Sequence, residues 1–135
     1  MDFVAPLGWT GSAAVRLGMV WGYNDRYAEY EESLNVSVGD RSVTFSTVPA
    51  GEVWVVESFA AWSAQTDVDT IYLKAHCDGA DLCLAARGFT TEFRSVALPN
   101  RIILKADDYL WALFEGCSLN NDIYASANGY KMKVV

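Results

Sequence analysis

The chain has 135 residues, of which 52% are hydrophobic and 13% aromatic, enough apolar side chains for the core of one domain. Its formal net charge is −7, and this acidic balance argues against direct nucleic-acid binding, which requires a basic surface. No run of about 18 apolar residues is present, and the N-terminus lacks a basic segment followed by an apolar run, so we expect neither a membrane span nor a signal peptide.

The first 33 residues differ in character from the rest and are expected to form an irregular N-terminal arm. They are rich in glycine and show no steady hydrophobic period, yet they are dense in aromatic side chains. An irregular segment this apolar should lie against protein, either its own domain, a sister subunit or another protein. We therefore expect the arm to form a partner interface through Phe3, Trp9, Trp21, Tyr23, Tyr27 and Tyr30.

One part of the arm has helical character. In the segment "NDRYAEYEESL", Tyr27, Tyr30 and Leu34 recur at spacings of three and four residues, and Asn24 or Asp25 could cap the first turn. The pattern predicts a short helix over residues 25–33.

From residue 34 onward the sequence predicts strands. Segments with β-branched and aromatic residues alternate with turn signals such as Pro49–Gly51, "DGAD" at 78–81 and "KADD" at 105–108. Gly88 and the pair Asn128-Gly129 indicate a bulge, bend or hairpin. About eight strands with regularly spaced turns predict one antiparallel sandwich or barrel over residues 34–135.

The strand expected over residues 52–62, "EVWVVESFAAW", is apolar on both faces. Strict alternation puts Trp54, Val56 and Trp62 on one face, and Val53, Val55 and Phe59 on the other. A facing sheet covers only one of them. We therefore expect protein to cover the second face, either the N-terminal arm or a sister subunit around a threefold axis, and the expected oligomer interface comprises Val55, Phe59 and Trp62.

The residue types that carry catalysis or hold metals are sparse. His76 is the only histidine, so a multi-histidine metal centre cannot be built, and a Ser-His-Asp arrangement would need this one residue. We interpret His76 as a structural or surface residue. The three cysteines are an odd number and are expected to be free thiols, although a bridge between Cys77 and Cys83 across "DGAD" stays open. The aspartates of the loops are interpreted as turn residues, with cation binding as the alternative. We predict no enzymatic activity, no cofactor and no metal.

Two stretches resemble small jelly-roll proteins of tailed-bacteriophage virions. They are "VPAGEVWVVESFAAW" at 48–62 and "LPNRIILKADDYLWALFEGCSLNNDIYASANGYKMKVV" at 98–135, and the likeness covers about residues 44–135. One departure is "KADD", which has Ala-Asp where that family usually has Gly-Asp. The resemblance implies an all-β, antiparallel jelly-roll β-sandwich.

The resemblance also implies a function. Proteins of this family include head-decoration or cement proteins, which commonly form homotrimers on the capsid exterior and clamp neighbouring major capsid subunits. We therefore expect a structural virion protein that is assembled in the host cytoplasm, with itself and a major capsid protein as partners.

The alternative is a carbohydrate- or receptor-binding jelly-roll module of a phage tail or fibre. Exposed aromatic side chains could then form a sugar-binding platform, with Trp9, Trp21, Trp62 and Trp111 as candidates. Core or interface packing is the competing interpretation of these tryptophans.

Overall fold

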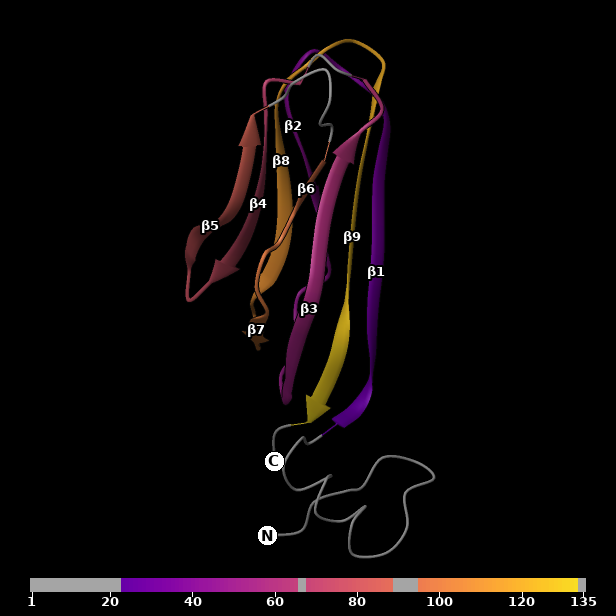
Figure 1. Ribbon diagram of the computed structural model, residues 1–135. Helices are drawn as coiled ribbons and strands as arrows, with labels where there is room; N and C mark the ends of the chain where they lie inside the picture. Colours follow the sequence, from indigo (N-terminus) through magenta and orange to yellow (C-terminus); the bar gives the residue numbers. More distant parts are fainter. Residues whose placement is uncertain (1–22, 66–67, 89–94, 134–135) are drawn as a thin grey trace, which may run out of the picture.

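The computed structural model describes residues 23–65, 68–88 and 95–133, and all of its regular structure in these ranges is β-strand (Figure 1). The expected arm residues Phe3, Trp9 and Trp21 lie outside the described residues. Within the described ranges, no helix is long and apolar enough to cross a membrane.

In the described part of the chain, nine strands form two antiparallel sheets that pack face to face. Sheet A has the order β1-β9-β3-β6, with β7 also paired to β3, and sheet B has the order β2-β8-β4-β5. The strands of sheet A are β1 (Tyr23–Val36), β9 (Asn121–Lys133), β3 (Glu52–Ser63), β6 (Ser95–Ala97) and β7 (Ile102–Lys105). The strands of sheet B are β2 (Gly39–Thr44), β8 (Tyr109–Cys117), β4 (Thr70–Cys77) and β5 (Ala80–Gly88).

This order is that of a jelly roll, in which each sheet alternates strands from the two halves of the chain. β6 and β7 pair with successive parts of β3, so together they act as one interrupted edge strand. Pro99 lies in the interruption, where a residue without an N–H donor does no harm to the ladder. The expected sandwich of about eight strands is confirmed.

The helix predicted over residues 25–33 is wrong, because these residues belong to β1. β1 pairs with β9 along its length, and it crosses the boundary expected at residue 33 between arm and sandwich. Tyr27 points into the core at 1% exposure, whereas Tyr30 and Leu34 are 54% and 52% exposed. The three residues therefore do not lie on one common face, as a helix would require. Pairing with β9 determines the structure of this segment, and the local spacing does not.

The core lies between the sheets and is built from aromatic and branched side chains. Phe45 and Phe59 have ring centroids 5.5 Å apart, and Tyr27 packs on Trp54 at 4.7 Å. All four are buried. They come from β1, β3 and the segment after β2. Packing in the core therefore also holds the segment that connects β2 of sheet B to β3 of sheet A.

The two ends of the sandwich differ. The connections β1–β2, β3–β4 and β8–β9 lie at one end, here called the loop end (upper in Figure 1). β1 begins and β9 finishes at the opposite end, here called the terminal end. At the loop end, buried Asn121 donates to the Ser63 hydroxyl at 2.8 Å and accepts from the Gln65 amide at 3.2 Å, which ties β3 to the start of β9.

A β-bulge in the middle of β3 explains why its sequence is apolar at successive positions. The register with β9 shifts between Val56 and Ser58, so Glu57 is an extra residue opposite Asn128-Gly129. Trp54 and Val56 point inward before the bulge, and Phe59 points inward after it. The Asn128-Gly129 pair therefore marks a bulge and not a hairpin.

Gly129 is required by this bulge. A Cβ atom on Gly129 would lie 1.9 Å from the carbonyl oxygen of Val55, which is backbone and cannot move aside. We predict that Gly129→Ala lowers the free energy of unfolding by about 3 kcal/mol, measured by urea denaturation. Gly88→Ala is the matched control, because a Cβ atom there meets nothing within 4 Å. Equal stability of the two variants would contradict this role of the bulge.

Candidate interaction surface

The outer face of sheet A carries almost no charge along its two central strands. Past the bulge, β3 presents Ser58, Ala60 and Trp62 outward, and before it Val53 and Val55. The outward positions of β9, taken from the same register, are Tyr124, Ser126, Asn128, Tyr130 and Met132. Glu57, at the bulge itself, is the one charged residue in the middle of this surface.

Glu57 forms a long ion pair with Arg101, with 3.8 Å between the carboxylate and guanidinium. Uncharged surfaces rich in aromatic residues are typical of the centre of protein interfaces. The outer face of sheet A has that character.

An aromatic cluster occupies this face near the loop end, and we call it the aromatic triad: Tyr30, Trp62 and Tyr124. Trp62 and Tyr124 are directly opposite on β3 and β9, with ring centroids 5.6 Å apart and planes 18° from parallel. Tyr30 on β1 lies 6.3 Å from Trp62 and 6.4 Å from Tyr124. The three rings form one contiguous surface across three neighbouring strands.

Two carboxylates border the aromatic triad. The Tyr30 hydroxyl donates to Glu32 at 2.8 Å, and this hydrogen bond raises the pKa of Tyr30 to about 12. Partial burial raises the pKa of Tyr124, and the negative charges of Asp122 and Glu32 raise it further. Asp122 is also tied to the last residues of β1, because its Oδ1 accepts from the Asn35 amide at 2.8 Å.

A second apolar patch lies on the same face toward the terminal end. It is centred on Val55 and is called here the Val55 patch; its members are Val53, Val55, Ile103, Tyr130 and Met132. Val55 is only 3% exposed and is not part of the core cluster, whereas Ile103 is 63% exposed. The area that this patch offers therefore comes from the neighbours of Val55.

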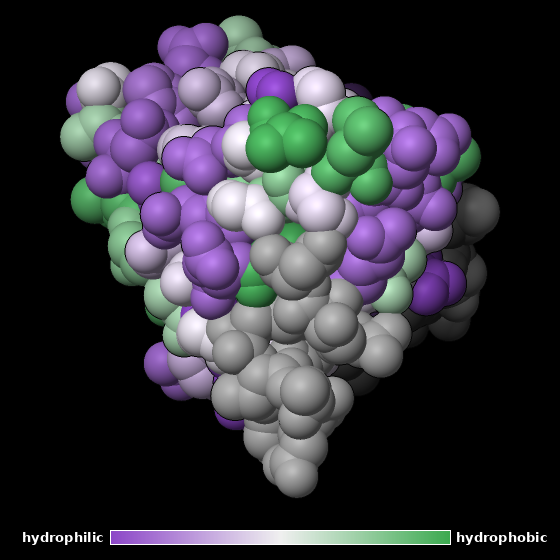
Figure 2. Space-filling model, turned by 90° about the horizontal axis from the view of Figure 1, so that it is seen from above, coloured by the Kyte–Doolittle hydropathy of each residue, from purple (hydrophilic) through white to green (hydrophobic). Residues whose placement is uncertain are grey.

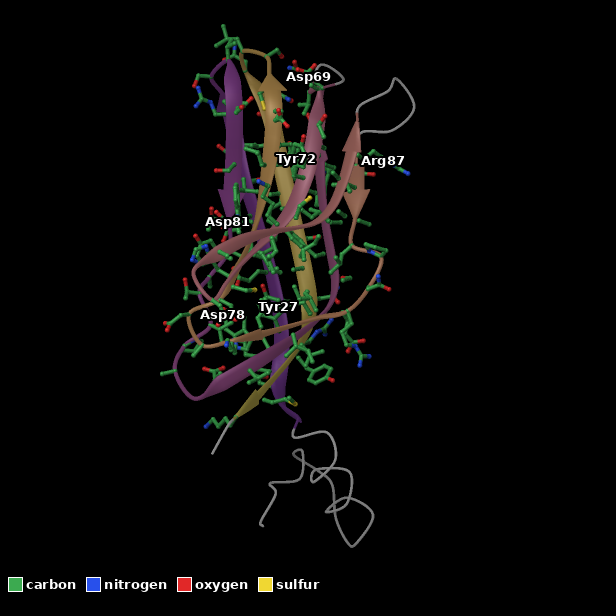
Figure 3. All side chains as sticks on the ribbon, turned by 90° about the vertical axis from the view of Figure 1, so that its left-hand side faces the viewer. Tyr27, Asp69, Tyr72, Asp78, Asp81 and Arg87 are labelled. Atoms are coloured by element: carbon green, nitrogen blue, oxygen red, sulfur yellow. The ribbon has the colours of Figure 1, made fainter. Side chains whose placement is uncertain are left out.

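The outer face of sheet B is aromatic as well, but charged groups are interleaved with its rings. The Lys74 ammonium lies 4.9 Å from the centre of the Trp111 ring and 5.6 Å from that of Tyr72. Figure 3 views this side, with Tyr72 and Asp81 over the sheet and Asp69 near the loop end. These rings already have a cation of the same chain as their partner.

His76 lies on this face, as expected, and is stacked on Tyr109 at 4.8 Å with its Nδ1 2.9 Å from Asp81. The hydrogen bond with His76 lowers the pKa of the Asp81 carboxyl. The Trp111 side chain lies close enough to Asp81 to lower the pKa of that carboxyl further. His76 is thus held by contacts on a sheet surface.

None of the three cysteines, all of which the structure describes, forms a disulfide, so Cys77 and Cys83 are not bridged. Cys77 pairs with Ala80 and Cys83 with Lys74, so the two do not face each other across the hairpin. Burial raises the pKa of the Cys77 thiol, and the neighbouring Asp108 raises it further. Among the described residues, no group of three or more His, Cys, Asp or Glu side chains is placed to hold a metal ion.

The structure separates the residues expected to form interfaces. Val55 and Trp62, which alternation put on opposite faces, share the outer face of sheet A because of the bulge. Phe59 is 1% exposed inside the sandwich, and Tyr27 is equally buried against Trp54, so neither is available for contact with another chain. Tyr30 is on the outer face, and Tyr23 lies in β1.

The sequence reasoning missed Tyr124 and Ile103. The alternation of Ile123, Ala125 and Ala127 with Tyr124 and Ser126 was the available signal for a strand with Tyr124 facing outward. Nothing local indicates that Tyr124 lies beside Trp62, because that depends on the pairing of β9 with β3.

Comparison with solved structures shows the same fold. A chain in the acidic stable capsid structure of Helicobacter pylori bacteriophage KHP30 has a TM-score of 0.59 at 7% identity, covering 80% of this chain and 89% of that one. This likeness, together with the strand order, confirms the antiparallel jelly-roll β-sandwich.

Two further structures are less similar. The Drosophila NLP core has a TM-score of 0.43 at 14% identity, covering 78% of this chain and 99% of that one. The virus-like particle of the giant freshwater prawn Macrobrachium rosenbergii extra small virus has a TM-score of 0.41 at 13% identity, covering 78% and 77%. Neither bears on function. No family model matches the sequence. No curated protein matches it either.

Burial of Tyr27 makes a prediction about alkaline pH. Desolvation, followed by the charge and hydrogen bond of Glu29, raises the pKa of the Tyr27 hydroxyl above its ordinary value of about 10. The resulting stabilisation is complete below pH 10, and is lost as the pH rises from 10 toward the folded-state pKa because the unfolded chain loses the proton first.

We expect the urea midpoint of the native chain to fall more between pH 8 and pH 11 than that of Tyr27→Phe. Parallel pH profiles of the two proteins would show that Tyr27 does not contribute to this loss.

Proposed function

We propose that the protein is a non-enzymatic structural component of a virus particle, a decoration or cement protein on the exterior of a capsid. The observation that carries the proposal is the outer face of sheet A, whose two central strands present only Glu57 and Asp122 as charged outward residues in a chain of net charge −7. Such a face is suited to being covered by protein. The likeness to a chain of a phage capsid structure supports the setting.

The proposed self-contact is the Val55 patch, through which copies of the chain form a homotrimer. Ile103 offers the most exposed apolar side chain of this patch, and Val53, Tyr130 and Met132 are its half-buried members on β3 and β9. About 800 Å² buried per partner is ordinary for a specific contact. A cyclic trimer would repeat this contact around its axis.

The proposed contact with the major capsid protein uses the N-terminal arm. Its aromatic residues Phe3, Trp9 and Trp21 precede β1, which begins at the terminal end. An arm of this composition gains free energy by covering apolar surface on a neighbour. Repeated over many copies, a modest gain per subunit would reinforce a shell.

The self-contact is tested by placing a charge in the Val55 patch. We expect Ile103→Glu to convert the trimer to monomer in native mass spectrometry, because an unpaired carboxylate would be buried at the contact. Val38→Glu is the matched control: Val38 is 66% exposed but lies at the loop end, away from the patch. A native chain that is monomeric at micromolar concentration would contradict the trimer, and dissociation by both variants would contradict its assignment to this patch.

The capsid contact is tested with the arm kept in the chain. We expect the combined substitution Phe3→Ser, Trp9→Ser and Trp21→Ser to abolish co-sedimentation with undecorated capsids while leaving the trimer intact. The combined substitution Ser12→Ala and Thr10→Ala in the same arm is the control. Unchanged decoration by the aromatic variant would show that the arm is not the clamp, and a native chain that binds glycans but no capsid would favour a receptor-binding module.

A further inference from the structure

Charge is unevenly distributed along sheet A, and the half nearer the loop end is acidic. Between the bulge and the loop end, the described strands of this sheet carry Glu29, Glu31, Glu32 and Asp122 and no lysine or arginine. Among the described residues, the basic residues of sheet A and its connections stand at the bulge or toward the terminal end: Arg26, Arg101, Lys105, Lys131 and Lys133.

The aromatic triad stands within this acidic half. Glu32 is directly opposite Tyr124 on the neighbouring strand, and Asp122 is two residues before Tyr124 on the same face. The rings therefore have carboxylates on their border. Glu29 is not part of this border, because it lies on the same side of β1 as buried Tyr27, where it accepts from the Ser46 amide at 3.1 Å and from the Tyr27 hydroxyl at 3.2 Å.

Two other tryptophan rings of the protein each have a lysine ammonium group as a cation–π partner. Lys74 lies 4.9 Å from the centre of the Trp111 ring, and Lys131 lies 4.7 Å from that of Trp54. Among the described residues, no lysine or arginine lies over the rings of the aromatic triad in this way. An aromatic surface bordered by carboxylates attracts a cation through both the ring quadrupoles and the negative charges.

We propose that the aromatic triad, with Glu32 and Asp122, is a docking site for a basic side chain of the capsid protein that this chain decorates. The inference rests on the proposed function, because it names the chemistry of that partner at this surface. Arginine fits better than lysine, since its planar guanidinium stacks on an aromatic ring while its N–H groups donate to a carboxylate.

The site is tested on the full chain without any capsid, using a hexa-arginine peptide in isothermal titration calorimetry. We expect Trp62→Leu, which leaves the net charge unchanged, to weaken binding about five- to tenfold. Trp111→Leu on the outer face of sheet B is the matched control and should bind as the native chain does. Equal losses in both variants, or none in Trp62→Leu, would overturn the proposal.

A second pair of variants tests the carboxylate and depends less on packing. Glu32→Gln and Asp25→Asn each remove one negative charge from β1, at exposed positions on opposite sides of the bulge. We expect only Glu32→Gln to weaken peptide binding beyond the uniform loss that reduced net charge produces. Identical effects of the two would mean that the peptide responds to overall charge, and the site would be rejected.

Two further measurements separate other occupants. Binding of neutral methyl glycosides that is lost in Trp62→Leu, without an effect on hexa-arginine, would identify a sugar site and overturn the proposal. Loss of the native trimer in Trp62→Leu would identify a second copy as the occupant, with the same consequence. Capsid co-sedimentation of the native chain is scored separately, so the proposed function can hold while this site fails.

Discussion

The β-bulge at Glu57, opposite Asn128-Gly129, is the constraint on which the surface chemistry of this protein depends. By adding one residue to β3, it reverses which side of the strand faces the core. Trp54, Val56 and Phe59 can then all be buried in one core. The close approach of the Val55 carbonyl to Gly129 holds this geometry in place, because any side chain at 129 would collide with backbone.

The same bulge produces an outer face whose two central strands are uncharged for several residues on both sides of Glu57. Val55 before the bulge and Trp62 after it come to the same surface, one toward the terminal end and the other near the loop end. The aromatic outer face of sheet B differs, because its rings and polar groups already have partners within the chain. Lys74 lies over the Trp111 ring, and His76 is paired with Asp81. The contrast between the two faces indicates which of them is suited to contact with another protein.

The two halves of the sheet A surface are suited to different contacts. The Val55 patch is apolar and exposes Ile103, which fits a partner of the same kind, such as another copy. The aromatic triad is bordered by acidic groups, which fits a basic partner. The decoration role proposed above requires both contacts, one with another copy and one with a different protein, and a jelly roll offers broad sheet faces on which both can be arranged.

The sequence by itself determined an all-β, antiparallel sandwich or barrel, the approximate strand count and the positions of the main turns, because these follow from local alternation and from turn residues. It also indicated that Asn128-Gly129 is a special position. It misassigned residues 25–33, because a spacing of three and four residues between Tyr27, Tyr30 and Leu34 is compatible with helix until pairing with β9 is known. Only the tertiary structure decided that Val55 and Trp62 share a face, that Phe59 does not, and that Tyr30, Trp62 and Tyr124 meet. The physical reason is that a single-residue bulge and the pairing of strands far apart in the chain set which side chains are neighbours, and neither is encoded in local periodicity.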